Sequence, residues 1–195
     1  YEMQRSLVGS EMCIRDSTPP YSLFSKKDYK SLYESSSRAD REELYRWIEY
    51  YKIKFKSRVY TPLNNSEKYT LVLMGRADFG LLGSYNKYKQ TPFETFYVGG
   101  DGMTGSYTYA TETIGLRGYD NGALTPYSDG RAYTRFSMEL HFPFLLQPSS
   151  TIYGLAFVEG GNAWTSLENF NPFSLKRSAG VGVRIFLPMI GLMGI

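Results

Sequence analysis

Hydrophobic and polar residues alternate with a period of two over several stretches of this chain. The pattern is clearest after Trp47, where apolar side chains at odd positions alternate with four cations at even positions: Lys52, Lys54, Lys56 and Arg58. Such alternation places the two sets of side chains on opposite faces of a β-strand. A strand is therefore predicted over residues 47–62, with a turn at and after Pro62.

Four more strands follow from the same pattern, and a sixth begins near Gly191. Their predicted ranges are residues 69–81, 133–142, 152–159 and 178–187. Pro143 and Pro148 are expected to bracket a turn, and Gly160 is expected to begin the break after residues 152–159. No clear helix lies between the strands, so they are predicted to pair as an antiparallel meander.

Alternation also predicts which side chains share a face. In residues 133–142 the polar face carries Arg135, Ser137, Glu139 and His141, and the other face is apolar. Residues 152–159 have apolar side chains on both faces, so the facing of Glu159 is left open. The pattern thus places Glu139 on a polar wall but does not decide the position of Glu159.

The start of the chain behaves differently. Residues 1–17 lack both the alternation of a strand and the apolar core of a signal peptide. The stretch RSLVGSEMCIRDS resembles a translated sequencing adaptor, so residues 1–17 are predicted to be non-native, with an ordinary polar loop as the alternative. The only cysteine, Cys13, lies there and supports no inference about redox chemistry. Residues 18–45 are polar and predict an exposed loop or a short helix.

Composition narrows the class of protein. The 195 residues include 18 Tyr, 12 Phe and 19 Gly, which favours a strand-rich domain with many turns. The net charge is only +3, and no basic cluster is interleaved with aromatics, so nucleic acid is not an expected partner. There is no run of about 20 apolar residues, which excludes a transmembrane helix. Strands of about 9–13 residues, with aromatics at their ends, favour a membrane barrel over a soluble β-sandwich.

Two motifs between the second and third strands suggest a family. PFETFYVGGDG at residues 92–102 and GLRGY at residues 115–119 resemble loop six of the BamA-like outer-membrane assembly factors. Downstream, SMELHFPF (137–144), AFVEGGNAW (156–164) and RSAGVGVRIFLP (177–188) resemble the twelfth, thirteenth and fourteenth strands of that family. With the loop-six segment counted as one, these are four motifs in the expected order, which is a specific signal, although Gly-Gly-Asp-Gly alone also occurs in ordinary turns.

The resemblance implies a fold and a domain organisation. The expected fold is all-β, an antiparallel transmembrane β-barrel that is partial, with about five to six strands of a sixteen-stranded barrel. Residues 18–195 are then a partial outer-membrane barrel domain truncated at both ends. The loop sequences are most similar to those of Bacteroidota members of the family.

The resemblance also implies a function. The family folds and inserts β-barrel proteins into the bacterial outer membrane. Its expected partners are unfolded outer-membrane β-barrel proteins, other subunits of the assembly machinery and outer-membrane lipids. Two alternatives share the barrel: a two-partner-secretion transporter and the barrel domain of a patatin-like phospholipase. The chain itself carries no Gly-x-Ser-x-Gly elbow, P-loop or paired histidines, so no catalytic residue, cofactor or metal is expected.

The candidate site is the loop-six tip, Leu116, Arg117, Gly118 and Tyr119. In the family this loop folds back into the barrel, where a guanidinium needs charged acceptors. We expect Arg117 to bridge Glu139, placed by parity, and Glu159, placed by the acidic position of the family. Whether this contact only holds the loop or also takes part in insertion is left open.

The remaining charged residues receive more ordinary interpretations. The four cations of residues 47–62 are expected to line a hydrated lumen, and His141 is expected to be structural. Asp101 and Asp120 are expected to be turn residues.

Overall fold

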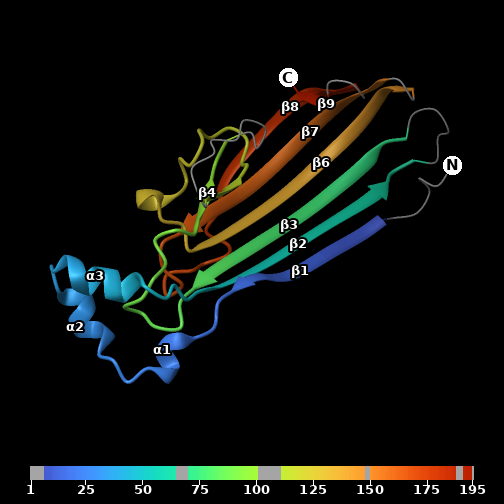
Figure 1. Ribbon diagram of the computed structural model, residues 1–195. Coiled ribbons are helices and arrows are strands. Elements are labelled where there is room, and N and C mark those ends of the chain that lie inside the picture. Colours follow the sequence, from blue (N-terminus) through green and yellow to red (C-terminus); the bar gives the residue numbers. More distant parts are fainter. Residues whose placement is uncertain (1–6, 65–69, 101–110, 148–149, 188–190, 195) are drawn as a thin grey trace.

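The computed structural model describes residues 7–64, 70–100, 111–147, 150–187 and 191–194. Its main element is a seven-stranded sheet in the order β1-β2-β3-β6-β7-β8-β9, in which all neighbours are antiparallel. The strands are β1 (Leu7–Ser17), β2 (Tyr51–Pro62), β3 (Val72–Gly83), β6 (Ala132–Gln147), β7 (Ser150–Trp164), β8 (Lys176–Leu187) and β9 (Gly191–Gly194). The predicted all-β antiparallel meander is confirmed, and Figure 1 shows its long strands lying side by side.

The two ends of this sheet differ in their connections. At one end the strands are joined through the short segments 63–71, 148–149 and 188–190, and at the other end through residues 18–50, 84–131 and 165–175. The long connections carry α1 (Tyr21–Phe24), α2 (Tyr29–Glu34), α3 (Arg38–Tyr45), β4 (Thr95–Val98), β5 (Thr111–Ile114) and the 3₁₀ turn η1 (Pro126–Ser128). Short turns at one end and long loops at the other are typical of outer-membrane barrels. None of the described helices is both long and apolar enough to cross a membrane.

The two faces of the sheet separate apolar from charged side chains. On the outer face the rings of Phe55, Phe79 and Phe136 contact one another across three strands. On the inner face, buried polar side chains gather on three neighbouring strands: Asp78, Ser137, Glu139 and Glu159. The facing that the sequence leaves open is decided on β7, where Val158 is 60 % exposed and Glu159 is 1 % exposed.

Residues 7–17 contradict the expectation that this segment lacks strand structure. They form β1 and pair with β2 over ten register positions, with an irregularity between Ile14 and Asp16. Strand pairing uses backbone N–H and C=O groups, so an edge strand can accept a segment whose side chains do not alternate. The pairing does not test whether residues 1–17 are native.

Two predicted breaks also fall inside strands. β6 continues through Pro143 to Gln147, because a register shift between Pro143 and Leu145 accommodates a residue without a backbone N–H. β7 continues through Gly160 and Gly161 to Trp164. A Cβ on Gly161 would lie 2.9 Å from the Thr134 carbonyl oxygen, so glycine marks a close approach at this position and not a turn.

The structure also tests the predicted helix and the predicted starts of the strands. Residues 18–45 form three short helices, which agrees with the helical alternative for this segment. β2 begins at Tyr51, so Trp47 precedes the strand that was predicted to include it. The strand near Gly191 is present as β9.

Candidate functional site: the loop between β3 and β6

The described parts of the loop between β3 and β6 fold back onto the inner face of the sheet. β4 and β5 pair in parallel and bury four apolar side chains of the loop: Phe96, Val98, Ile114 and Leu116. These pack against Leu82, Tyr133 and Ala163 of the sheet. The rings of Phe96 and Tyr133 meet edge to face with their centroids 4.7 Å apart. An apolar core therefore holds the loop on the sheet, in addition to the ion pairs of the loop.

The loop tip is held by its backbone as well as its side chains. Leu116 is fully buried and forms an isolated bridge with Gly100. Gly118 has a φ of 86°, and a Cβ there would lie 3.2 Å from the Cβ of Ser178 on β8. The Tyr119 hydroxyl donates to the carbonyl oxygen of Arg177, 2.8 Å away. The glycine thus lets the tip turn close to β8, with the tyrosine bound to that strand.

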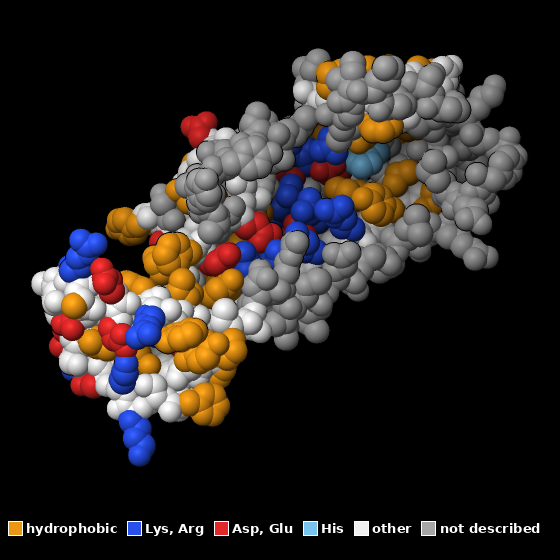
Figure 2. Space-filling view, in the orientation of Figure 1, with side chains coloured by type: hydrophobic (Ala, Val, Ile, Leu, Met, Phe, Trp, Pro, Cys, Tyr) orange, Lys and Arg blue, Asp and Glu red, His pale blue; other side chains and the backbone are white. Residues whose placement is uncertain are grey.

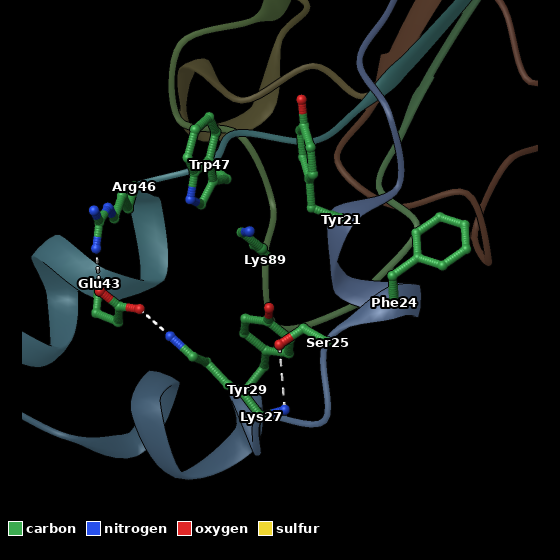
Figure 3. Close-up of a pocket in the computed structure, with 9 residues that line it drawn as sticks. All are labelled: Tyr21, Phe24, Ser25, Lys27, Tyr29, Glu43, Arg46, Trp47 and Lys89. Carbon is green, nitrogen blue, oxygen red and sulfur yellow. Dashed lines mark hydrogen bonds and ion pairs between the residues drawn. The ribbon is translucent and has the colours of Figure 1, made fainter.

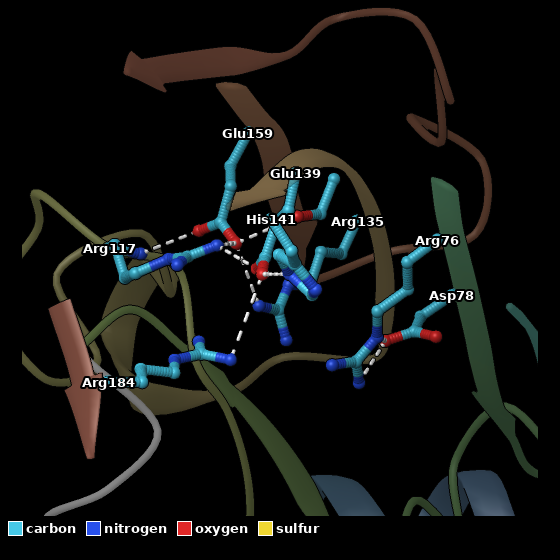
Figure 4. Close-up of polar contacts among 9 residues, drawn as sticks. Arg76, Asp78, Arg117, Arg135, Glu139, His141, Glu159 and Arg184 are labelled. Carbon is cyan, nitrogen blue, oxygen red and sulfur yellow. Dashed lines mark hydrogen bonds and ion pairs between the residues drawn. The ribbon is translucent and has the colours of Figure 1, made fainter. Parts of the chain in front are cut away.

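Arg117 lies between two glutamates of neighbouring strands (Figure 4). Its Nη2 atom donates to Glu159 Oε1 at 2.5 Å and also contacts Glu139 Oε1. Its backbone N–H donates to Glu159 Oε2 at 3.0 Å. The structure therefore brings together the three charged residues singled out in the sequence, and Glu159 binds both the main chain and the side chain of the tip.

Other residues of the sheet complete the shell around the two glutamates. Glu159 Oε1 also accepts from Arg135 Nη2 and from the Ser137 hydroxyl, each at 3.0 Å. Glu139 Oε2 lies 2.9 Å from His141 Nε2 and 3.7 Å from Arg184 Nη1. His141 is thus a direct neighbour of the site. Strand parity predicts that Arg135, Ser137 and His141 share the face of Glu139, but it could not assign their partners.

The arginine side chain does not bind the two glutamates through a fork of separate donors. One nitrogen, Nη2, contacts both glutamates, and Nε has no hydrogen-bond partner among the described residues. The guanidinium lies over the ring of Phe157. Burial disfavours the charged form, but the hydrogen bonds and charges of Glu159 and Glu139 outweigh it and raise the pKa of Arg117 above its ordinary value. The tip carries a permanent cation.

A second set of ion pairs holds the other arm of the loop, with the signs reversed. Lys52 Nζ lies 2.8 Å from Glu94 Oε2, and Lys54 Nζ lies 2.7 Å from Glu112 Oε2. Both lysines are buried, so the expectation that they line a hydrated lumen is wrong. Lys56 is partly exposed and Arg58 is exposed, so for these two the expectation stays a prediction. Figure 2 shows Lys and Arg side chains together with Asp and Glu side chains in a hollow of the molecule.

Glu112 shows how the ion pairs keep an acid of the loop charged. Burial alone would raise the pKa of the Glu112 carboxyl, but hydrogen bonding from Lys54 and the charge of Lys52 outweigh burial and lower it. The cations on one face of residues 47–62 are the sequence signal that could have found this cluster, since buried cations require counter-ions. It did not indicate which acids would supply them.

The other two residues interpreted from the sequence are Asp120 and Asp101, both expected in turns. The Asp120 carbonyl oxygen accepts from the N–H of Ala123, as expected of a turn residue. Asp101 lies outside the described residues. Each carboxylate of the two clusters is paired with cations, and the described residues contain no group of acids, histidines or cysteines arranged to hold a metal. This chemistry suits holding a loop in place.

An all-β antiparallel sheet with an apolar outer face, a charged inner face and an inward-folded loop defines the chain as part of a transmembrane β-barrel. The chain belongs to the Omp85 superfamily, whose domain model matches residues 36–195. One similar relative is the outer membrane protein assembly factor BamA of Neisseria meningitidis serogroup B (strain ATCC BAA-335 / MC58). It is 30 % identical over 119 residues, which are 60 % of this chain but 14 % of that relative.

Proposed function

We propose that this chain is part of an outer membrane protein assembly factor, which folds and inserts β-barrel proteins into the bacterial outer membrane. The observation that carries the proposal is the docking of Arg117 between Glu139 and Glu159 in a chain of the Omp85 superfamily. The similar relative from Neisseria is an outer membrane protein assembly factor, which supports assembly as the activity. Unfolded barrel proteins, other subunits of the machinery and outer-membrane lipids are the proposed partners.

The described loop contacts suggest what the loop contributes. Its arm is bound to β2 through Lys52 and Lys54, and its tip is bound to β6 and β7 through Arg117. Tyr119 adds a hydrogen bond to β8. The loop therefore links five neighbouring strands, β2, β3, β6, β7 and β8, from the inside. We infer that it keeps this part of the barrel wall in one curvature, so that substrate strands meet a wall of fixed shape.

An assembly assay on the complete protein tests this proposal. The protein is reconstituted in lipid vesicles and mixed with an unfolded eight-stranded barrel protein, and the folded fraction is followed by its heat-modifiable mobility on gels. We expect Arg117→Met to lower the initial rate at least tenfold, because the tip loses both carboxylates. Arg58→Met is the matched control, since this arginine is exposed. Equal rates for both variants and the unaltered protein would contradict a role of the tip.

The geometry also indicates which substitutions give a clean test of the ion pair. Exchanging the charges of Arg117 and Glu139 would place a new arginine beside His141 and Arg184, which both contact Glu139. A double-mutant cycle with neutral residues, Arg117→Met and Glu139→Gln, avoids this repulsion. If the double variant loses no more assembly activity than Arg117→Met alone, the two side chains act as a pair. If the losses of the two single variants add in full, the side chains act separately.

Substrate range separates assembly from the related activities. An assembly factor is expected to fold several unrelated barrel proteins in the vesicle assay. A two-partner-secretion transporter would instead release one dedicated partner, and a patatin-like phospholipase would hydrolyse the vesicle lipids. We propose no catalytic residue, cofactor or metal for this chain.

A further inference from the structure

Away from the loop site, a cavity of about 380 Å³ lies where the helices meet the segment after β3 (Figure 3). Four aromatic side chains form part of its wall, from the segment that carries α1 to α3: Tyr21, Phe24, Tyr29 and Trp47. The rings of Tyr21 and Trp47 are 5.3 Å apart and tilted, so they form a corner. Trp47 is 56 % exposed and remains open to a ligand. Aromatic walls with a few polar groups are typical of small-molecule sites of this size.

Lys89 supplies the unusual feature of this cavity. The residue is only 3 % exposed, and Figure 3 shows its ammonium group directed into the space between the aromatic rings. Among the described residues its contact is the face of the Tyr29 ring, 5.2 Å away, and no carboxylate lies within ion-pair distance. A buried ammonium without an anionic partner is unfavourable. The cavity therefore has a place for an anion.

The other charged side chains of the cavity strengthen this preference. Lys27 and Arg46 also line it, and both pair with a single acid, Glu43, at the open side. Buried Glu49 lies nearby on the chain but accepts from the N–H of Ser22 and does not line the cavity. Three cations and one carboxylate leave a net charge of +2 on the lining.

We propose that this cavity binds a phosphorylated sugar, with the phosphate on Lys89 and Arg46 and the sugar ring against Trp47 and Tyr21. Phosphate accepts several charge-assisted hydrogen bonds, which suits a lining that carries two lysines and an arginine. Tyrosine and tryptophan present flat apolar faces with polar edges, which suit the C–H face of a sugar. An aliphatic anion would leave the aromatic corner unused.

The position of the cavity limits where the ligand comes from. The cavity lies at the end of the sheet that carries the long connections, as Figure 1 shows for the helices. In an outer-membrane barrel this end faces the exterior. The phosphorylated sugar can be free in solution or be the headgroup of a glycolipid in the outer leaflet, and both present the same chemistry to Lys89.

Calorimetric titration of the complete protein in detergent tests the proposal. The probes are glucosamine 1-phosphate, inorganic phosphate, and vesicles containing a diphosphorylated glucosamine glycolipid. We expect binding of the sugar phosphate, of the glycolipid vesicles, or of both, and the two arms identify the source. Binding of neither overturns the proposal. If inorganic phosphate binds as tightly as the sugar phosphate, the sugar contributes nothing to binding and that part of the proposal is wrong.

Variants tie the binding to the cavity. Lys89→Met and Trp47→Ala are each expected to weaken binding at least tenfold. Lys87→Met is the matched control, because this exposed lysine lies on the same segment, contacts the Tyr88 ring and does not line the cavity. Trp47→Ala keeps the test valid if Lys89→Met fails to fold. An equal loss in Lys87→Met would reveal non-specific attraction and overturn the site.

Discussion

The guanidinium carbon of Arg117 lies 3.7 Å from the centroid of the Phe157 ring. Phe157 precedes Glu159 by two residues on β7, so both face inward and one strand offers the arginine a carboxylate and an aromatic face. A planar guanidinium can use both at once, whereas an ammonium is a compact point charge.

Arg117→Lys therefore tests the shape of the cationic group, because the variant keeps the positive charge. We expect it to lower stability by about 1–2 kcal/mol through loss of the stacked contact and of the planar donors. Arg117→Met should lower it further, because two carboxylates lose their partner. The measurement is the temperature at which half of the detergent-solubilised protein loses its folded mobility on a gel. A lysine variant as stable as the arginine protein would show that the ring contact contributes nothing.

The two glutamates are expected to differ in importance. Glu159 accepts from the backbone and side chain of Arg117, from Arg135 and from Ser137, and it is almost completely buried. In Glu159→Gln the amide nitrogen must face one of these donors, and the buried arginines lose their counter-charge. Removing one partner from a buried pair costs about 3–5 kcal/mol. Glu139→Gln should cost less, and a reversed order of the two unfolding temperatures would contradict this assignment.

The arm of the loop predicts a pH dependence. The pKa of Glu112 is lowered in the folded protein, so its ion pairs contribute stability above its unfolded value of about 4.3 and lose it as the pH falls through the folded value. Glu112→Gln should therefore be less stable than the unaltered protein at pH 7, and the difference should shrink below about pH 4. Unfolding temperatures at pH 7 and pH 3 measure this. An unchanged difference at the two values would exclude the carboxylate as its source.

Lys54 provides the partner variant for the same contact. Glu112→Gln leaves Lys54 buried and without its nearest acid, so adding Lys54→Met is expected to recover part of the lost stability. Lys56 is the control position, because it lies 3.8 Å from Glu112 and is far more exposed. Lys56→Met should change the unfolding temperature only slightly.

Gly161 predicts a steric effect on the loop tip. A Cβ there would lie 2.9 Å from the Thr134 carbonyl oxygen and 3.2 Å from Cδ1 of Leu116. Gly161→Ala should therefore push the tip away from β7 and lower the unfolding temperature. Gly75→Ala is the matched control, since nothing lies within 4 Å of a Cβ at that position of β3. Equal behaviour of the two variants would mean that the tip does not need this close approach.

The origin of residues 1–17 is a separate prediction. We propose that they derive from an adaptor and that the chain continues beyond residues 18–195 in a longer protein of Bacteroidota type. Resequencing the source genome across the codons for Ser17 and Thr18 decides this. Encoded continuity through residue 17 would make β1 a native strand.

Much of the fold follows from the sequence because alternation reports the two environments of a strand residue by residue. The order of β2, β3, β6, β7, β8 and β9, the inward face of Glu139 and the outward face of Phe136 follow from local patterns. The same reasoning could not find β1, whose pairing with β2 depends on backbone groups. It also placed strand ends at Pro143 and Gly160, because a bulge or a close approach looks like a turn in the sequence.

The partners of the charged residues were decided by the tertiary structure. The sequence by itself determined that Arg117 needs carboxylates and that the lysines of β2 share a face. Lys54 and Glu112 are 58 residues apart, and Glu159 lies on a strand whose pattern does not define its faces. Ion pairing depends on distance and burial, and both arise only when the apolar core around Phe96 and Leu116 folds the loop onto the wall.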